Sequence, residues 1–324
     1  MSLRALTAAT LVAAASFAAA PAFAKTQPDQ VVVFGDSLVD AGNVFIATGG
    51  ATPDPAKGYY PGHFTNGRDY TDLLSQRLYA HDSRPALAGG NNYAFGGASI
   101  LVSNFTVPNL PAQLGLYAAG SAAFGLTGHA VDPKALYVLN FGGNDVFAIE
   151  SGKVPAATVP AYEAAAVDTL ANAIQALDAG GATKILVTGI PNLDAVGIPF
   201  DALLQSKLNG LKLTNAALFR FNYLDFFTRL AANPGKLGVP AFTKPGACFD
   251  HVAPPAPGVL PDCSGYFTVD GTHPIAPIQA AIFREVAHTT GIGTVPEPAA
   301  WSLMIAGFGL VGSATRRRRV ATAA

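Results

Sequence analysis

The sequence predicts an α/β fold of three layers (α/β/α), in which a doubly wound parallel sheet is covered by helices on both faces. Continuous apolar runs, typical of strands buried on both faces, occupy residues 31–34, 135–141 and 184–188. Helical patterns alternate with them at residues 70–78, 161–179, 203–230 and 275–288. Alternating strands and helices imply a parallel sheet, whose functional sites form at the carboxyl ends of the strands.

The N-terminus has the pattern of a secretory signal peptide. Residues 1–24 carry one early positive charge, Arg4, then an Ala/Leu/Val-rich run, then the small-x-small site Ala22-Phe23-Ala24. Cleavage there makes Lys25 the mature N-terminus. The alternative is a buried Ala-rich helix, although no polar residues are patterned at helical spacing in this run.

The C-terminal segment, residues 294–324, looks like a sorting signal. A Val-Pro-Glu-Pro motif at 295–298 precedes an uncharged span at 299–315, and four arginines follow at 316–319. The span is at the short end of what crosses a bilayer, and the arginines would stay cytoplasmic. The segment resembles the PEP-CTERM signal of Gram-negative bacteria, which an exosortase reads before the protein reaches the cell surface or is released. An ordinary C-terminal anchor helix is the alternative, and either one holds the precursor at a membrane.

Between these ends lies one domain, residues 25–293. The formal charge of −1 hides an asymmetry, because five of the 20 Lys and Arg residues lie in the terminal segments whereas nearly all 21 acidic residues lie between them. An acidic domain lacks the basic surface patch that binding to nucleic acid requires. An even cysteine count in an exported chain favours a disulfide, here between Cys248 and Cys263, worth very roughly 3 kcal/mol in the chain-entropy model. Two free thiols are the alternative.

Two Pro/Gly-rich loops, 49–62 and 233–262, interrupt the alternating pattern. The second loop holds both cysteines, and either a cap over the site or a long surface loop is compatible with the sequence.

The segment Gly35-Asp36-Ser37 directly follows the first predicted strand. A serine at a turn from strand to helix exposes its hydroxyl at the sheet edge, and we expect the N–H of Ser37 to lie at a helix N-terminus, facing a developing oxyanion. By itself the tripeptide is more often a turn with a helix cap.

Two further segments supply hydrogen-bond donors. The pair Gly96-Gly97 has no Cβ atoms, so that a backbone N–H can approach a ligand closely. Asn144 follows the strand that ends at Phe141 and offers a side-chain amide. Together with the N–H of Ser37, these groups would form an oxyanion hole, and the choice between Gly96 and Gly97 stays open.

The segment 269–274 precedes the last predicted helix and contains Asp270 and His273. A serine hydroxyl needs an adjacent base to become a nucleophile, and His273 can supply it. Asp270 can hold the other ring N–H of His273 and fix its tautomer. An isolated Asp-x-x-His is usually a surface turn, so the joint occurrence of all four segments in this order is what carries the prediction.

These four segments resemble the GDSL family, also called SGNH hydrolases, from Val31 to about His288. The chain looks closest to the long branch that includes lecithinase/haemolysin-type and plant-like enzymes. The resemblance implies a flavodoxin-like fold, with Ser37 as nucleophile, His273 as base, Asp270 as its orienter, and Asn144 with one glycine at the oxyanion. In the branch's Gly-Arg-Phe-Ser-Asn-Gly stretch, His63 stands here at the arginine position and Thr65 at the serine position, neither of them catalytic in the family.

Other chemistries lack their signatures. The Gly-x-Ser-x-Gly elbow and the P-loop are missing from the sequence, and no Gly-x-Gly-x-x-Gly fingerprint occurs within the domain at residues 25–293. No metal-ligand spacing links the remaining histidines, which are His63, His81, His129, His251 and His288. We therefore expect no cofactor and no metal.

The expected reaction is hydrolysis of an ester through an acyl-enzyme. Lipid or phospholipid esters are favoured by the resemblance, by the membrane-directed tail and by an apolar loop at 107–116. An esterase that removes acyl groups from surface polysaccharide is the runner-up. A non-catalytic surface adhesin on a hydrolase fold is a third hypothesis, which the intact serine, histidine and amide positions disfavour.

Overall fold

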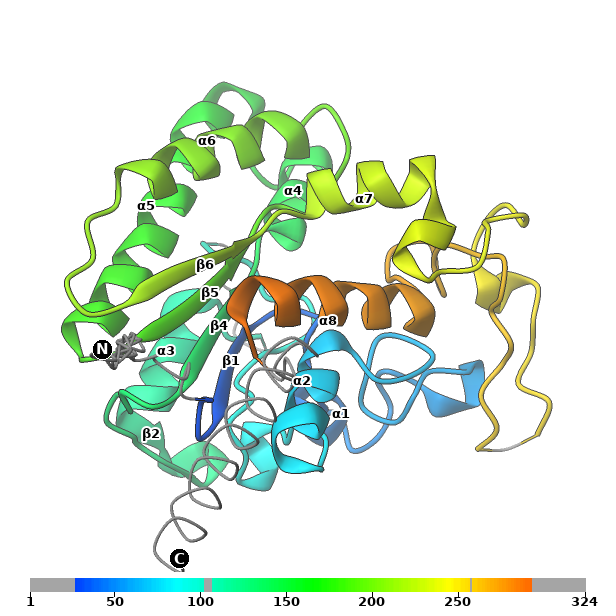
Figure 1. The fold of residues 1–324 in the computed structure, drawn as a ribbon, viewed down its shortest axis with the longest axis horizontal. Helices are drawn as coiled ribbons and strands as arrows, with labels where there is room; N and C mark the ends of the chain where they lie inside the picture. Colours follow the sequence, from blue (N-terminus) through cyan, green and yellow to red (C-terminus); the bar gives the residue numbers. More distant parts are fainter. Residues whose placement is uncertain (1–26, 102–106, 257, 293–324) are drawn as a thin grey trace, which may run out of the picture.

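The structure is a computed structural model of the 324-residue chain, and it describes residues 27–101, 107–256 and 258–292. The expected signal peptide and sorting segment lie outside these residues. A four-stranded parallel sheet forms the centre (Figure 1). Its strands, in spatial order, are β1 (Val31–Gly35), β4 (Leu136–Asn140), β5 (Lys184–Thr188) and β6 (Ala217–Phe221).

An extended segment at 91–95 flanks the outer edge of β1. The N–H of Val33 donates to the carbonyl of Asn91 (3.0 Å), and the N–H of Tyr93 donates to the carbonyl of Val33 (2.7 Å). The chain therefore passes from β1 to one side, and then crosses to β4 on the other side. This reversal is the switch point of a doubly wound sheet, and it confirms the predicted fold class.

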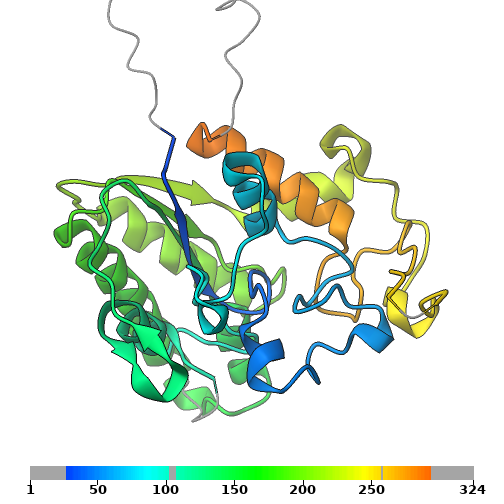
Figure 2. The same ribbon diagram turned by 90° about the horizontal axis from the view of Figure 1, so that it is seen from below.

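Helices cover both faces of the sheet (Figure 2). One buried cluster joins alternate residues of the strands to α3, α5 and α6, and a second joins the intervening residues to α2, α7 and α8. Val32 and Phe34 belong to the first cluster, whereas Val31 and Val33 belong to the second. The strands are thus buried on both sides, as their apolar runs predict. The helices are α1 (Asn43–Ala47), α2 (Tyr70–Tyr79), α3 (Leu110–Ala119), α4 (Gly143–Glu150), α5 (Val159–Ala179), α6 (Gly197–Gly210), α7 (Tyr223–Ala232) and α8 (Ala276–Thr290). A small antiparallel pair, β2 (Gly120–Ser121) and β3 (Leu126–Thr127), lies beyond α3.

The helix expected at 203–230 is wrong, because the chain forms α6, β6 and α7 over this stretch. The carboxylate of Asp178 accepts the N–H groups of Thr214 (2.9 Å), Asn215 (2.7 Å) and Ala216 (2.7 Å). These bonds fix a turn after α6 and direct the chain into the sheet beside β5. The Asn222 side chain then caps α7 by accepting the N–H of Asp225 (2.9 Å).

The apolar stretch at 107–116 is also not a loop at the site. Most of it belongs to α3, whose Leu110 and Tyr117 are buried in the core. It therefore gives no support to a lipid substrate.

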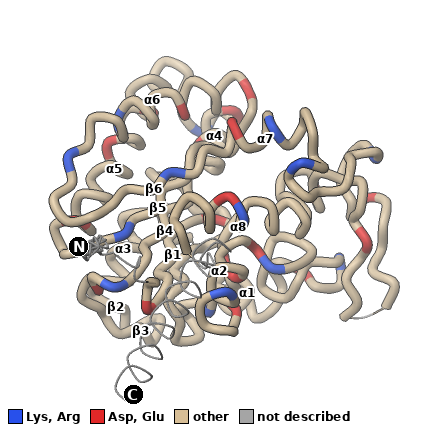
Figure 3. The backbone as a smooth tube through the Cα atoms, viewed as in Figure 1, with Lys and Arg blue, Asp and Glu red and all other residues tan. Residues whose placement is uncertain are grey.

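Cys248 and Cys263 form the expected disulfide, with their Cα atoms 5.5 Å apart. The long segment that contains them runs along one end of the molecule, in yellow at the right of Figure 1. In Figure 3, basic and acidic residues are spread over many of the described elements. Across the residues that the structure describes, every helix is too short or too polar to cross a membrane, and the apolar span at 299–315 lies outside them.

Candidate active site

The structure brings Ser37, His273 and Asp270 into one hydrogen-bonded chain at the carboxyl edge of the sheet. Ser37 Oγ lies 2.7 Å from His273 Nε2, and His273 Nδ1 lies 2.6 Å from Asp270 Oδ2. Because Nδ1 faces a carboxylate, it carries the proton, and Nε2 is left to accept the serine proton. This arrangement can turn a hydroxyl into a nucleophile.

Asp270 is fixed by its own turn. Its Oδ1 accepts the N–H groups of Thr272 (3.0 Å) and His273 (2.8 Å), while its Oδ2 also accepts the hydroxyl of Tyr59 (2.7 Å). Burial alone would raise the pKa of Asp270, but the hydrogen bonds and charge of His273, with the Tyr59 hydroxyl, hold that pKa well below its usual value. The carboxylate therefore stays ionised beside the imidazole.

Ser37 lies in a turn and not at the start of a helix, which corrects the expectation from sequence. The N–H of Val39 donates to the carbonyl of Asp36 (3.2 Å), and α1 begins only at Asn43. The side chain of Asp40 is the reason, because it accepts the N–H groups of Gly42 (2.8 Å) and Asn43 (2.7 Å) and so places the helix start beyond the serine. A short helix of five residues also contributes little dipole.

The two glycines left open by the sequence differ in their hydrogen bonding. The N–H of Gly96 donates to Asp40 Oδ2 (2.9 Å), and a Cβ at Gly96 would overlap the ring of Phe64. Gly97 is exposed at φ +84°, and no acceptor among the described residues engages its N–H. Neither glycine lines the cavity beside Ser37, whereas Asn144 does.

Asn144 is oriented by the loop that carries the glycines. Its Nδ2 donates to the carbonyl of Ala98 (2.9 Å). A primary amide has two N–H groups, so the second one remains for a ligand in the cavity.

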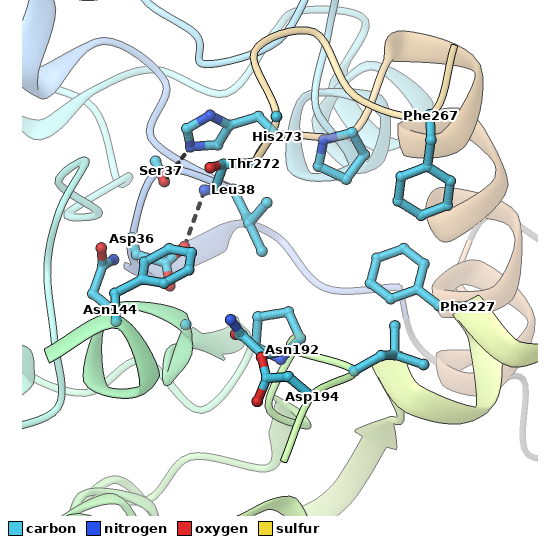
Figure 4. Close-up of a pocket in the computed structure, with 16 residues that line it drawn as sticks. Asp36, Ser37, Leu38, Asn144, Asn192, Asp194, Phe227, Phe267, Thr272 and His273 are labelled. Carbon is cyan, nitrogen blue, oxygen red and sulfur yellow. Dashed lines mark hydrogen bonds between the residues drawn. The ribbon is translucent and has the colours of Figure 1, made fainter. Parts of the chain in front are cut away.

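The cavity beside Ser37 has a volume of about 270 Å³ (Figure 4). In the figure, Asn144 lies on one side, the rings of Phe227 and Phe267 lie on the opposite side, and Asn192 and Asp194 lie along another edge. Two apolar side chains of the cavity wall remain largely exposed, Phe147 at 42% and Leu193 at 49%. No described residue of the segment 233–262 lines this cavity.

A buried polar network lies beneath the serine. Asp36 accepts the N–H of Leu38 (3.0 Å) and the amide of Asn140 (3.3 Å), and Asn140 in turn accepts the hydroxyls of Tyr70 (3.1 Å) and Tyr223 (2.8 Å). Burial raises the pKa of Asp36 to about 7. The network ties the serine turn to both α2 and α7, which belong to the face of the sheet opposite α3.

Comparison with known proteins identifies the family to which the chain belongs. The GDSL-like Lipase/Acylhydrolase model matches residues 31–286, which is most of the chain. The chain belongs to the GDSL-like lipase/acylhydrolase family. A second model, the PEP-CTERM protein-sorting motif, matches residues 294–319.

Relatives of this GDSL-family chain include plant and bacterial proteins. It is 27% identical over 218 residues to a GDSL esterase/lipase of Arabidopsis thaliana, covering 62% of this chain and 60% of the plant protein. It is 30% identical over 172 residues to the thermolabile hemolysin of Vibrio parahaemolyticus, covering 51% of this chain and 35% of the hemolysin. The chain thus spans less than two thirds of the length of each of these relatives.

Among solved structures, an α/β hydrolase from the metagenome of Lake Arreo, LAE5, matches with a TM-score of 0.45 and 14% identity, over 82% of this chain and 96% of that one. The acetylxylan esterase Axe2 of Geobacillus stearothermophilus matches with a TM-score of 0.43 and 13% identity, over 82% and 96%.

His63, at the arginine position of the GDSL-family stretch, is buried with two aspartates. Its Nε2 lies 2.7 Å from Asp72 Oδ2, and its Nδ1 lies 2.9 Å from the carbonyl of Pro61. Burial alone would lower the pKa of His63, but the carboxylate of Asp72, with that of Asp69 farther away, raises it to about 10. His63, Asp69 and Asp72 are also the described side chains whose spacing could ligate a metal ion, with ligand atoms within 4.8 Å of one another. An imidazolium at His63 supplies the positive charge that these carboxylates need.

Sequence reasoning missed Tyr59 and the aromatic wall of this GDSL-family site. Tyr59 donates to Asp270, which is 211 residues away in the sequence. The ring of Phe227 on α7 packs against that of Phe267 in the loop before α8, with centroids 5.5 Å apart. The only local signal for Tyr59 is its place beside the stretch at 60–67, four residues before His63.

Proposed function

We propose that this chain is an exported serine ester hydrolase that forms an acyl-enzyme on Ser37. The observation that carries the proposal is the contact of Ser37 Oγ with His273 Nε2, which lies on the side of the imidazole opposite Asp270. Membership of the GDSL-like lipase/acylhydrolase family supports the same reaction class.

In the proposed reaction, His273 Nε2 takes the proton of Ser37 while the serine oxygen attacks the ester carbonyl carbon. The resulting oxyanion accepts hydrogen bonds from the N–H of Ser37 and from the amide of Asn144, both of which line the cavity. Of the two glycines, Gly97 is the proposed third donor, because its N–H has no acceptor among the described residues whereas that of Gly96 donates to Asp40, although Gly97 itself lies outside the cavity lining. The imidazolium then protonates the leaving alcohol. In the second half, His273 Nε2 removes a proton from water while the water oxygen attacks the acyl carbon. The bond between that carbon and Ser37 Oγ then breaks as the imidazolium returns the proton to the serine oxygen, which releases the acid and free Ser37.

The cavity wall favours an ester with an apolar acyl or alkyl chain. Leu38, Phe227 and Phe267 line the side of the cavity away from Asn144. The exposed side chains of Phe147 and Leu193 also line the cavity and add apolar surface to it. Burying each methylene of a chain on such a surface contributes roughly 0.8 kcal/mol. A volume of about 270 Å³ is small for a ligand pocket, so it suits one chain and not a branched lipid as a whole.

An acyl ester of a polysaccharide is the second candidate substrate. Asn192 and Asp194 line the cavity, and side chains of this kind can bind sugar hydroxyls. Release of acetate from an acetylated glycan, compared with release of fatty acid from phospholipid, separates the two substrates.

Export and sorting belong to the same proposal. The PEP-CTERM motif at 294–319 supports processing by an exosortase-type enzyme, after a signal peptide at 1–24 has directed the chain across the membrane. The substrate would then be met at the cell surface or outside the cell.

The proposal is tested with p-nitrophenyl esters of increasing chain length. Wild-type protein should hydrolyse them, and Ser37→Ala should abolish turnover while circular dichroism and the thermal midpoint stay unchanged. A Ser37→Ala variant with wild-type turnover would show that another group is the nucleophile.

A further inference from the structure

The hydroxyl of Tyr59 and the imidazole of His273 share one oxygen of Asp270. The Tyr59 hydroxyl donates to Oδ2 at 2.7 Å, and His273 Nδ1 lies 2.6 Å from the same atom. Tyr59 arrives from the loop before α2, far in sequence from the segment that carries the other two residues.

The two oxygens of Asp270 have different partners. Oδ1 accepts backbone N–H groups from Thr272 and His273, and these bonds belong to the turn itself. Among the described residues, the donors to Oδ2 are the side chains of His273 and Tyr59, so its position depends in part on a group outside the turn. A carboxylate has about four acceptor positions, and these four donors fill them. Without the Tyr59 hydroxyl, the imidazole would be the sole protein donor to Oδ2.

Aromatic contacts hold Tyr59 in place. Its ring packs edge-on against Phe249, with centroids 4.9 Å apart, and against Phe64, with centroids 6.3 Å apart. Phe64 in turn lies 5.3 Å from the ring of His273. Phe64 therefore contacts both Tyr59, which donates to Asp270, and the imidazole of His273, which Asp270 orients.

The disulfide segment fixes Phe249. Phe249 follows Cys248, which is bonded to Cys263, and the N–H of Phe249 donates to the carbonyl of Val269 (2.8 Å), directly before Asp270. Gly58 fits closely against this segment, since a Cβ there would lie 2.7 Å from Pro261 Cγ. The loop before α2 and the disulfide segment are thus packed together behind Asp270.

We propose that Tyr59 is a positioning residue, whose hydroxyl holds Asp270 Oδ2 against His273. By donating a hydrogen bond to this oxygen, the hydroxyl also reduces the negative charge that Asp270 presents to the imidazole. Phe249 of the disulfide segment keeps the Tyr59 ring in place. The inference rests on the proposed function. Burial and the charge of Asp270 raise the pKa of Tyr59 above its ordinary value, so the hydroxyl remains a donor at every pH at which the enzyme works.

The test compares Tyr59→Phe with Tyr60→Phe in hydrolysis of a p-nitrophenyl ester across pH. Tyr60 is the matched control, because it is the neighbouring tyrosine and its hydroxyl donates to Asp82 (3.3 Å), away from the triad. Tyr59→Phe keeps both ring contacts and removes one hydrogen bond to a charged group. We expect kcat to fall about tenfold with KM unchanged.

The acidic limb of the pH–rate profile gives a readout that a merely structural role would not move. This limb reports protonation of the general base. With no Tyr59 hydroxyl, more negative charge remains on Oδ2 to stabilise the imidazolium, so the limb should move to higher pH by several tenths of a unit. Tyr60→Phe should keep the wild-type kcat and the wild-type limb. A loss of folded protein alone would lower the rate at all pH values equally.

A wild-type kcat and an unshifted limb in Tyr59→Phe would overturn the inference. Should Tyr59→Phe be unfolded at the assay temperature, Phe249→Ala replaces it: the hydroxyl is retained but its support is removed, and we expect a smaller fall in kcat with a shifted limb. Wild-type kinetics in a folded Phe249→Ala would then overturn the inference. Failure of the proposed function is a separate outcome, because wild-type protein itself would then show no Ser37-dependent ester hydrolysis.

Discussion

A buried imidazolium at His63 should make the stability of this protein depend on pH in the alkaline range. His63 and Asp72 are both nearly inaccessible to solvent, with exposed side-chain fractions of 6% and 0%. Asp69 is buried beside them, and its carboxylate caps α2 by accepting the N–H groups of Thr71 (2.6 Å) and Asp72 (3.0 Å). Removal of the positive charge would leave two carboxylates together in the interior.

The magnitude follows from the pKa of His63, which is raised from 6.5 to about 10. Each unit of difference between folded and unfolded pKa values corresponds to about 1.4 kcal/mol, so protonation of His63 stabilises the fold by about 4 to 5 kcal/mol. Loss of one partner of a buried ion pair typically costs about 3 to 5 kcal/mol, which agrees. Because the folded pKa is the higher one, this contribution is fully present below pH 6.5 and is lost as pH rises through about 10.

Urea unfolding of wild-type protein and His63→Gln, from about pH 6 to about pH 10, measures this contribution. Titration of the surface lysines and tyrosines affects both proteins alike, so the difference between their unfolding free energies reports the charge state of the buried group of His63, Asp69 and Asp72; burial and the charge of Asp72 raise the pKa of Asp69 to about 7, and the charge of His63 opposes that rise. We expect that difference to be several kcal/mol at pH 6 and to shrink steadily toward pH 10. A difference that stays constant over this range, or one below about 1 kcal/mol at pH 6, would refute the assignment of an imidazolium to His63.

Two further predictions concern the cavity. Asn144→Ala should lower kcat by about 10² to 10³ with little change in KM, because we propose that its amide binds an oxyanion that forms only along the reaction path; an unchanged kcat in steady-state assays would remove Asn144 from the mechanism. Phe227→Ala should raise KM more for long-chain than for acetyl esters, since it removes apolar surface from the wall that would bind the chain; equal effects on both esters would show that the chain binds elsewhere.

The sequence predicts most of the sheet, because strands buried on both faces are continuous apolar runs. β5 has the predicted bounds, and β1 and β4 differ from prediction by a residue or two. The edge strand β6 was missed, since its residues are only partly buried and its pattern merges with the helices on either side. What separates these elements is the side chain of Asp178, which lies 36 residues before the turn that it fixes.

Three of the four chemical segments, those that carry Ser37, Asn144 and His273, line one cavity, as expected for segments that follow a strand of a parallel sheet or precede the last helix. The Gly96-Gly97 pair does not line it. The finer roles of the four segments depend on contacts between distant segments. The proposal of Gly97 over Gly96 rests on the carboxylate of Asp40, which accepts the N–H of Gly96 and is 56 residues from it. Tyr59 is one of ten tyrosines, and its place beside the stretch at 60–67 does not by itself indicate that it reaches Asp270.

The central claim, that Ser37 is a nucleophile activated by His273, is tested most directly by labelling with a fluorophosphonate probe followed by peptide mass spectrometry. We expect one adduct, on the peptide that contains Ser37, and loss of that adduct in Ser37→Ala and in His273→Ala. A wild-type protein that takes up no probe, as a non-catalytic adhesin would not, or one that is labelled at a different residue, would contradict the account.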